Sequence, residues 1–209
     1  MKKIIQYWNA DMPTDVKVLT ETWQEMNPTF EYILFDHELA QKFMQEHFSK
    51  DIFNSFKQLT IPAMICDVFR VAVILKLGGI YVDCGTKCYK PVTELNLDYS
   101  KCTFLRKWNG WVWNGWVCAE EGNPVIKAIW NRISNVLLNR TEGNIWALTG
   151  PKVFMDIVNE FTVTKLNYSK CEVNSEINSP VINIIDQRVF KLTPFFFSYT
   201  LSKTGLYTL

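Results

Sequence analysis

Apolar and polar positions repeat along this chain with two different periods, and segments of each kind follow one another in order. Short apolar runs indicate strands, and longer stretches with apolar residues every three or four positions indicate helices. The expected strands cover 3–8, 31–35, 80–82, 102–105, 112–119 and 181–185, and the expected helices cover 14–26, 37–47, 51–58, 62–77, 124–139 and 151–161. This alternation predicts an α/β fold that begins with a βαβ unit.

The helix expected over 62–77 carries the strongest signal, because Pro62 suits its first turn and a glycine pair at 78–79 stops it. Its apolar face consists of Ile65, Val68, Phe69, Ala72 and Leu75. Asp67 and Arg70 interrupt the apolar segment three positions apart, so both side chains project from nearly the same face. Such a pair can hold one ligand together, and the alternative is a simple ion pair within the helix.

Composition narrows the classes of function. The chain has 209 residues and a mass of 24.4 kDa, so we expect 1–209 to form a single domain. Hydrophobic residues make up 48% and aromatic residues 14%, which excludes disordered, collagen-like and coiled-coil chains. The formal net charge of +1 is too balanced for general attraction to nucleic acid, so any anion site must be local.

Nothing near the N-terminus indicates export. The positive start loses its apolar run at Gln6, and no stretch approaches the roughly 18 apolar residues of a membrane span. We therefore expect a cytoplasmic protein that is soluble or peripheral at the inner face of the membrane. Six cysteines without an export signal favour free thiols, and Cys84 and Cys88 lack the second close pair that would indicate structural zinc.

A second acid stands where a ligand is expected. The strand over 80–82 ends at Asp83, and ligands of open α/β sheets gather at the carboxyl ends of strands. Carboxylate oxygens suit Mg²⁺ or Mn²⁺, ions that can neutralise a pyrophosphate. With Asp67 and Arg70, Asp83 completes the candidate catalytic set, and the alternative for Asp83 is a turn former ahead of Gly85.

The run from Asp67 to Asp83 resembles the signature of sugar-nucleotide-dependent glycosyltransferases of the GT-A fold, in particular family 32 and the related capsular polysaccharide synthesis proteins. Further positions that match this family in order and spacing are 4–8, Trp23, Asn27, Pro28, 32–35, Asn123, Pro124 and 149–151. The similarity extends from about Lys3 to Phe161. It implies a GT-A-type, Rossmann-like nucleotide-sugar-binding fold with a mixed central sheet flanked by helices.

The resemblance also implies roles for particular residues. Trp8 would stack on the donor base, Asp67 and Arg70 would hold the donor sugar, and Asp83 would bind the metal. Tyr81 lies within the matching run and is predicted to bind substrate. For Trp8, the alternative is an ordinary core aromatic at the end of a strand.

This chain departs from family 32 at Gly85, where the family usually has a second aspartate. Gly85 offers no side-chain ligand, so Mn²⁺ or Mg²⁺ is expected to be held weakly by Asp83, phosphates and water. The alternative is metal-independent chemistry in which Lys87 assists the phosphates. Lys87 as a solvated lysine of a turn is the plain interpretation.

A doubled Trp-Asn-Gly-Trp-Val unit covers 108–117 and brings four tryptophans into nine residues: Trp108, Trp111, Trp113 and Trp116. We predict that one or two of these tryptophans line the site, and select Trp113, because sugar rings pack on indoles, while alternate tryptophans fill the core. The family resemblance implies that Asn114 lies near the sugars. The segment 192–209 is aromatic and mildly basic. It is expected to join the core or to contact a membrane beside a lipid-linked acceptor.

The sequence therefore predicts a hexosyltransferase of surface polysaccharide synthesis. Its partners would be a nucleotide-sugar donor, with uridine diphosphate sugars favoured over guanosine diphosphate mannose, and a glycan or lipid-linked saccharide acceptor. The resemblance implies retention at the anomeric carbon, in a front-face mechanism assisted by phosphate. The alternative is a carbohydrate-binding protein on a decayed glycosyltransferase scaffold. This alternative is motivated by Gly85 and by the absence of a histidine and a tryptophan near the C-terminus.

Overall fold

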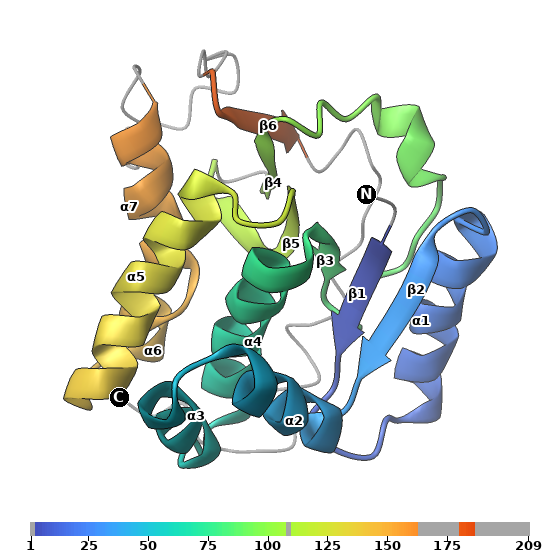
Figure 1. The fold of residues 1–209 in the computed structure, drawn as a ribbon. Helices are drawn as coiled ribbons and strands as arrows, with labels where there is room; N and C mark the ends of the chain where they lie inside the picture. Colours follow the sequence, from blue (N-terminus) through green and yellow to red (C-terminus); the bar gives the residue numbers. More distant parts are fainter. Residues whose placement is uncertain (1–2, 108–109, 163–179, 187–209) are drawn as a thin grey trace.

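The computed structural model describes residues 3–107, 110–162 and 180–186, which form one mixed sheet flanked by helices (Figure 1). The six described strands lie in the order β2-β1-β3-β5-β4-β6. Their bounds are β1 Lys3–Tyr7, β2 Glu31–Phe35, β3 Gly79–Val82, β4 Cys102–Arg106, β5 Val112–Ala119 and β6 Ile182–Asp186. Strand β1 is parallel to β2 and β3, β4 is parallel to β6, and β5 is antiparallel to both neighbours.

The helices occupy the predicted segments with shifts of about one residue. They are α1 Thr14–Met26, α2 His37–His47, α3 Lys50–Lys57, α4 Pro62–Leu77, α5 Pro124–Asn139, α6 Ile145–Leu148 and α7 Pro151–Phe161. The expected βαβ unit is confirmed as β1-α1-β2. Two short elements were not expected, the 3-10 helix Val92–Leu95 and α6. Helix α6 has only four residues, and its start depends on a local cap in which the Asn144 side chain accepts a hydrogen bond from the Trp146 amide.

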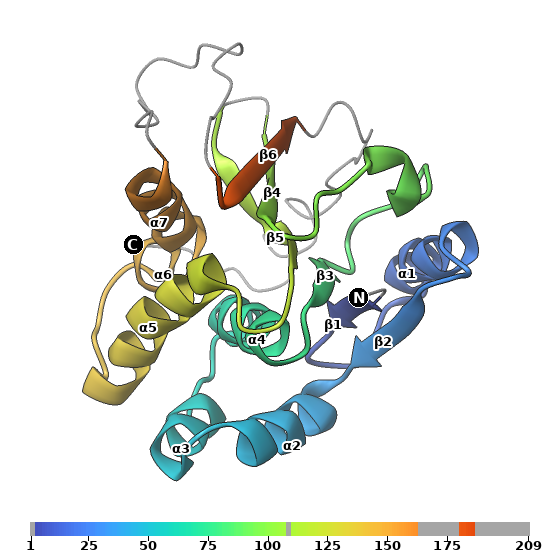
Figure 2. The same cartoon turned by 45° about the horizontal axis from the view of Figure 1, so that its top comes forward.

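Strands β1, β3, β4 and β5 are buried on both faces, as their near-continuous apolar sequences require, whereas the edge strand β2 is partly exposed. Alternate positions belong to different clusters: Ile5 and Tyr81 pack with the helices α4, α5 and α7, whereas Ile4 and Ile80 pack with Trp23 of α1. Figure 2 shows α1 on one side of the sheet and α4 and α5 on the other. The architecture is therefore a sheet between two helical layers.

The turn from α4 into β3 depends on a glycine pair. Gly78 ends the helix with φ 60°, and Gly79 follows with φ 110°, a conformation that L side chains rarely adopt. A Cβ at Gly79 would also lie 3.0 Å from the Cβ and carbonyl oxygen of Lys3 on β1. Glycine at this position therefore lets β3 pair closely with β1, and that pairing places Asp83 at the carboxyl end of the sheet.

Some predictions fall on residues outside the described ranges. The segment 192–209, expected as a core strand or a membrane contact, and Trp108 of the doubled unit belong to this part of the chain. Within the described ranges, no helix combines the length and apolar character that crossing a bilayer requires.

Candidate active site

The predicted site residues meet at one edge of the sheet. Strands β1 and β3 are parallel, so their carboxyl ends, followed by Trp8 and Asp83, lie at the same edge. Strand β5 runs in the opposite direction, and its first residues, including Trp113 and Asn114, therefore start at this edge. Helix α4 runs antiparallel to β3 and carries Asp67 there in its first half.

Arg70 is the centre of a buried cluster that joins both predicted carboxylates. One terminal nitrogen, Nη1, lies 3.3 Å from Asp67 Oδ1, and Nη2 lies 3.1 Å from Asp83 Oδ1. Nη2 also donates to the sulfur of Cys66 at 3.0 Å, and the guanidinium lies 5.3 Å from the centre of the Tyr81 ring. The ion pair within the helix is thus present, but it extends to a carboxylate on β3. Both terminal nitrogens of the Arg70 guanidinium thus contact acids of the protein, so Arg70 orients these two acids.

Asp67 is held on both oxygens. Its Oδ1 accepts a hydrogen bond from Asn114 Nδ2 at 2.8 Å, and its Oδ2 accepts a long one from Thr149 Oγ1 at 3.5 Å. Burial raises the pKa of Asp67 to about 7 and the charge of Asp83 adds to this, while Arg70 and both hydrogen bonds oppose it. This carboxyl group therefore changes its protonation state near neutral pH.

Asp83 is the most exposed acid of the cluster, with 13% of its side chain accessible. Its main chain is fixed, because its amide donates to the Gly115 carbonyl at 2.8 Å and its carbonyl accepts from the Thr86 hydroxyl at 2.6 Å. Its Oδ2 lies against Gly115, where a Cβ would be 2.2 Å from Oδ2 and 2.5 Å from Trp113 Nε1. The glycine of the second Trp-Asn-Gly unit thus makes the space that this carboxylate occupies.

Helix α1 holds the loop that follows Asp83. The Trp23 indole donates to the Thr86 carbonyl at 2.9 Å, and the Thr22 hydroxyl accepts from the Cys88 amide at 2.9 Å. Further along, the Asn27 side chain accepts from the Val92 amide at 2.7 Å. Trp23 and Asn27 matched the family in spacing, and the structure shows why such residues matter: they position the loop.

Trp8, Lys87 and Tyr81 were predicted to contact the substrate, and the structure shows what each side chain contacts within the protein. Trp8 is half-buried, and its indole donates to the Asp11 carbonyl at 3.3 Å. Lys87 is half-buried, and its Nζ lies 5.0 Å from the ring centre of the exposed Tyr89. Tyr81 is fully buried, and its hydroxyl lies 3.2 Å from Cys66 Sγ, so the geometry gives it a supporting role beneath Arg70. Contact of these residues with substrate stays a prediction.

Sequence reasoning missed several side chains at the site. Lys107 follows β4, and its Nζ lies 5.9 Å from the ring centre of Trp113; burial lowers the pKa of Lys107, and Asp83 opposes this shift. Cys66 contacts Arg70, and Thr149 contacts Asp67. Two features of the sequence could have indicated these residues: Lys107 stands directly before the doubled unit, and Thr149 lies in the segment 149–151 that matches the family.

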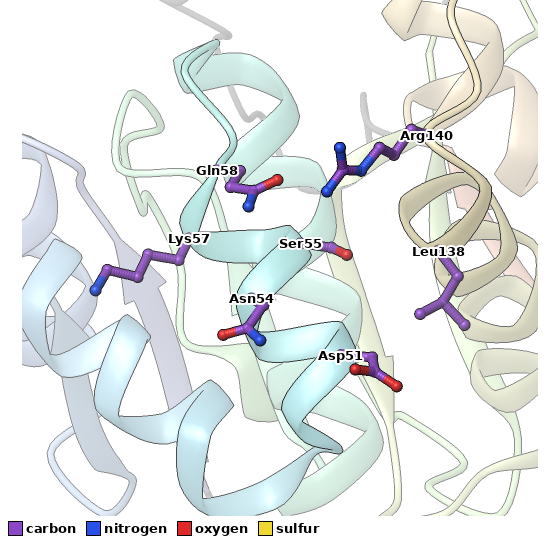
Figure 3. A pocket seen from close by; sticks show the side chains of 7 residues that line it. All are labelled: Asp51, Asn54, Ser55, Lys57, Gln58, Leu138 and Arg140. Carbon is purple, nitrogen blue, oxygen red and sulfur yellow. The ribbon is translucent and has the colours of Figure 1, made fainter.

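An aromatic pair stands beside this cluster. Trp111 precedes β5, and Trp146 belongs to α6, whose end leads directly into Thr149. Their ring centres are 5.4 Å apart with planes tilted by 45°, and 36% of Trp111 is exposed. A separate surface pocket between α3 and the end of α5 shares no residue with the cluster; Figure 3 shows its lining of Asp51, Asn54, Ser55, Lys57, Gln58, Leu138 and Arg140.

The donor set at Asp83 does not fit a metal ion held by the protein alone. Within the described ranges, no three His, Cys, Asp or Glu side chains are grouped so that they could hold an ion. Arg70 already contacts Asp83 Oδ1, which leaves Oδ2 as the carboxylate oxygen without a hydrogen bond to a described residue. Mg²⁺ and Mn²⁺ prefer about six oxygen ligands. One carboxylate oxygen cannot make such a cage.

Comparison with known proteins shows what this site is similar to. The family model described as "Glycosyltransferase sugar-binding region containing DXD motif" matches residues 13–101. This part of the chain is similar to a glycosyltransferase sugar-binding region. That region contains Asp67, Arg70 and Asp83, so the resemblance expected from the sequence is confirmed.

Individual relatives agree with this family. The chain is 20% identical to an "Initiation-specific alpha-1,6-mannosyltransferase" of Candida albicans, over 77% of this chain and 52% of that protein. It is 24% identical to an "Uncharacterized glycosyltransferase L373" of Acanthamoeba polyphaga mimivirus, over 72% of this chain and 60% of that protein. It is 22% identical to the "Putative glycosyltransferase HOC1" of Saccharomyces cerevisiae, over 74% and 47%. The chain thus spans about half the length of these curated relatives.

The fold comparison points the same way. The structure resembles the solved "PaToxG Glycosyltransferase" with a TM-score of 0.63 and 20% sequence identity, over 76% of this chain and 69% of that one. This likeness confirms the predicted α/β fold of the GT-A class. The matched region and the fold are thus both similar to those of glycosyltransferases.

Proposed function

We propose that this protein transfers a hexose from a nucleotide diphosphate sugar to a hydroxyl group of a glycan or glycolipid. The observation that carries the proposal is the buried Asp67-Arg70-Asp83 cluster at the carboxyl edge of the sheet, inside the matched sugar-binding region. Asp67 would accept hydrogen bonds from hydroxyl groups of the donor sugar, with Arg70 and Asn114 fixing its orientation. Asp83 would face the donor from the end of β3.

Two classes of nucleotide sugar are candidates for the donor. Uridine diphosphate sugars follow from the resemblance at Trp8. Guanosine diphosphate mannose is supported by the name of the Candida albicans relative, a mannosyltransferase. Retention at the anomeric carbon fits a site in which no described acid beyond Asp67 and Asp83 joins the cluster, and both of these already contact Arg70.

For the acceptor, we propose the aromatic pair of the exposed Trp111 and the half-buried Trp146 as a platform for a saccharide ring. The apolar C–H face of a sugar packs on an indole, and both tryptophans lie on segments that lead into the cluster. Surface polysaccharide synthesis at the inner face of the membrane is the setting that this acceptor class suggests.

The test is release of nucleoside diphosphate from a panel of uridine diphosphate sugars and guanosine diphosphate mannose, with a saccharide mixture as acceptor. Asp83→Ala should lower turnover about 10²-fold or more, the scale of a lost preorganised charge. Asp98→Asn is the matched control, because 51% of the Asp98 side chain is exposed and its ion pair with Lys101 lies outside the cluster. Saccharide binding without turnover on any donor would favour the carbohydrate-binding alternative and refute the proposal.

A further inference from the structure

In the candidate donor site, the two acids already occupy the charge of Arg70. Asp67 and Asp83 are both acids, and the terminal nitrogens of Arg70 already contact them and Cys66. A nucleoside diphosphate brings further negative charge to this edge of the sheet. Gly85 stands where the family has a second aspartate, and no group of described side chains could hold a metal ion here in its place. Another cation has to meet the phosphates.

Lys107 is a cation on the wall of this site. It follows β4, and its backbone is fixed in the turn to β5: its amide donates to the Trp111 carbonyl at 2.8 Å, and its carbonyl accepts from the Gly110 amide at 2.9 Å. Its Nζ lies 5.9 Å from the ring centre of Trp113. Trp113 Nε1 and Asp83 Oδ2 both lie within 2.5 Å of the point where a Gly115 Cβ would stand. Lys107, Trp113 and Asp83 thus form one continuous wall.

The surroundings of Lys107 differ from those of Lys87. Both lysines are half-buried, but Lys107 Nζ lies 5.9 Å from the ring centre of Trp113, a residue of the site, and burial lowers the pKa of Lys107 while the charge of Asp83 opposes this. Lys87 Nζ instead lies over the exposed ring of Tyr89. Between the two lysines, the geometry therefore favours the one that sequence reasoning overlooked.

We propose that Lys107 binds the donor diphosphate. Its positive charge would take the place of a metal ion that a second motif carboxylate would otherwise help to hold. This inference rests on the proposed function, since it assigns a residue to the donor site. The amine would donate hydrogen bonds to phosphate oxygens and would stabilise the negative charge that develops on the leaving diphosphate. No bond to Lys107 forms or breaks.

Calorimetry with nucleosides and nucleoside diphosphates tests the proposal directly. Uridine, uridine diphosphate, guanosine and guanosine diphosphate are titrated into the full-length protein with excess chelator present. The wild type should bind one diphosphate more tightly than its nucleoside. Lys107→Met should reduce that advantage about tenfold or more, the scale of a lost charge-assisted hydrogen bond, and leave nucleoside affinity unchanged. Lys107→Arg should restore part of it.

The matched control is Lys101→Met, because Lys101 pairs with the exposed Asp98 at 3.8 Å and should not affect the diphosphate advantage. Unchanged diphosphate affinity in Lys107→Met would overturn the inference. Diphosphate binding that needs Mn²⁺, or no binding of either diphosphate with chelator present, would also overturn it. If donor turnover is unchanged in Lys107→Met, the inference about Lys107 is refuted and the proposed function is not. If diphosphate binding depends on Lys107 but the protein turns over no donor, the proposed transferase function is refuted and the inference about Lys107 is not.

Discussion

Gly115→Ala is the substitution for which the structure makes the sharpest prediction. A Cβ at this position of β5 would lie 2.2 Å from Asp83 Oδ2 and 2.5 Å from Trp113 Nε1, whereas ordinary contacts begin at 3.4 Å. The added methyl must therefore push the carboxylate aside by about 1 Å, a displacement on the scale that costs about 10²-fold in rate. That factor corresponds to about 2.7 kcal/mol of transition-state stabilisation.

The same change should leave the protein folded. Overpacking costs about 1–3 kcal/mol, and replacing a strand glycine by alanine recovers about 0.5–1 kcal/mol of conformational entropy. We therefore expect a net loss of about 1–2 kcal/mol in the free energy of unfolding, measured by urea denaturation. The rate is measured as release of nucleoside diphosphate from whichever donor the panel identifies.

A double variant separates the mechanism from general damage. In an Asp83→Ala background the carboxylate is gone, so Gly115→Ala should lower kcat/KM by much less than it does in the wild type. Additive losses would show that Gly115 acts through something other than the carboxylate. A folded Gly115→Ala protein with wild-type kcat/KM would refute the reasoning altogether.

Three further predictions follow from the same cluster. Asp67→Asn should remove a pH dependence of stability: the folded pKa of about 7 lies above the unfolded value of 3.8, so the stability that Asp67 contributes is complete below pH 4 and is lost as the pH rises to 7, by about 4 kcal/mol. Urea unfolding at pH 4 and 7 would contradict this if the wild type and variant changed in parallel. Trp111→Ala should raise the acceptor KM about fivefold, as a lost contact of about 1 kcal/mol implies, and leave donor hydrolysis unchanged. Mn²⁺ should bind the nucleotide-free wild type poorly and Gly85→Asp more tightly in calorimetry; full-affinity binding to the wild type would show that the cation is misplaced.

The elements of the fold could be predicted from local patterns because nearly every described helix and strand is marked at its ends or by its period. Pro62 and the glycine pair bound α4, and the Asp36 side chain caps α2 by accepting a hydrogen bond from the Leu39 amide. Helix α6 escaped prediction because four residues are too few to show a helical period. Its position depends on a local cap at Asn144.

The site was predictable only in part, since sequence spacing shows which residues share an element but not which elements meet. Asp67 and Arg70 lie on one helix, and Asp83 follows the next strand, so their proximity could be inferred. The partners Asn114 and Thr149 come from segments 47 and 82 residues away, and their contact with Asp67 depends on tertiary packing. A family resemblance pointed to both segments without saying what they contact.

The groups that orient the two acids lie outside the region that matches the family model. The matched region ends at residue 101, so it contains both acids and Arg70 but not the partners that tune them. Asn114 and Thr149 fix Asp67, and Gly115 makes room for Asp83, all from the part of the chain beyond the match. The choice of donor would then depend on β5 and the segment before α7 at least as much as on the motif itself.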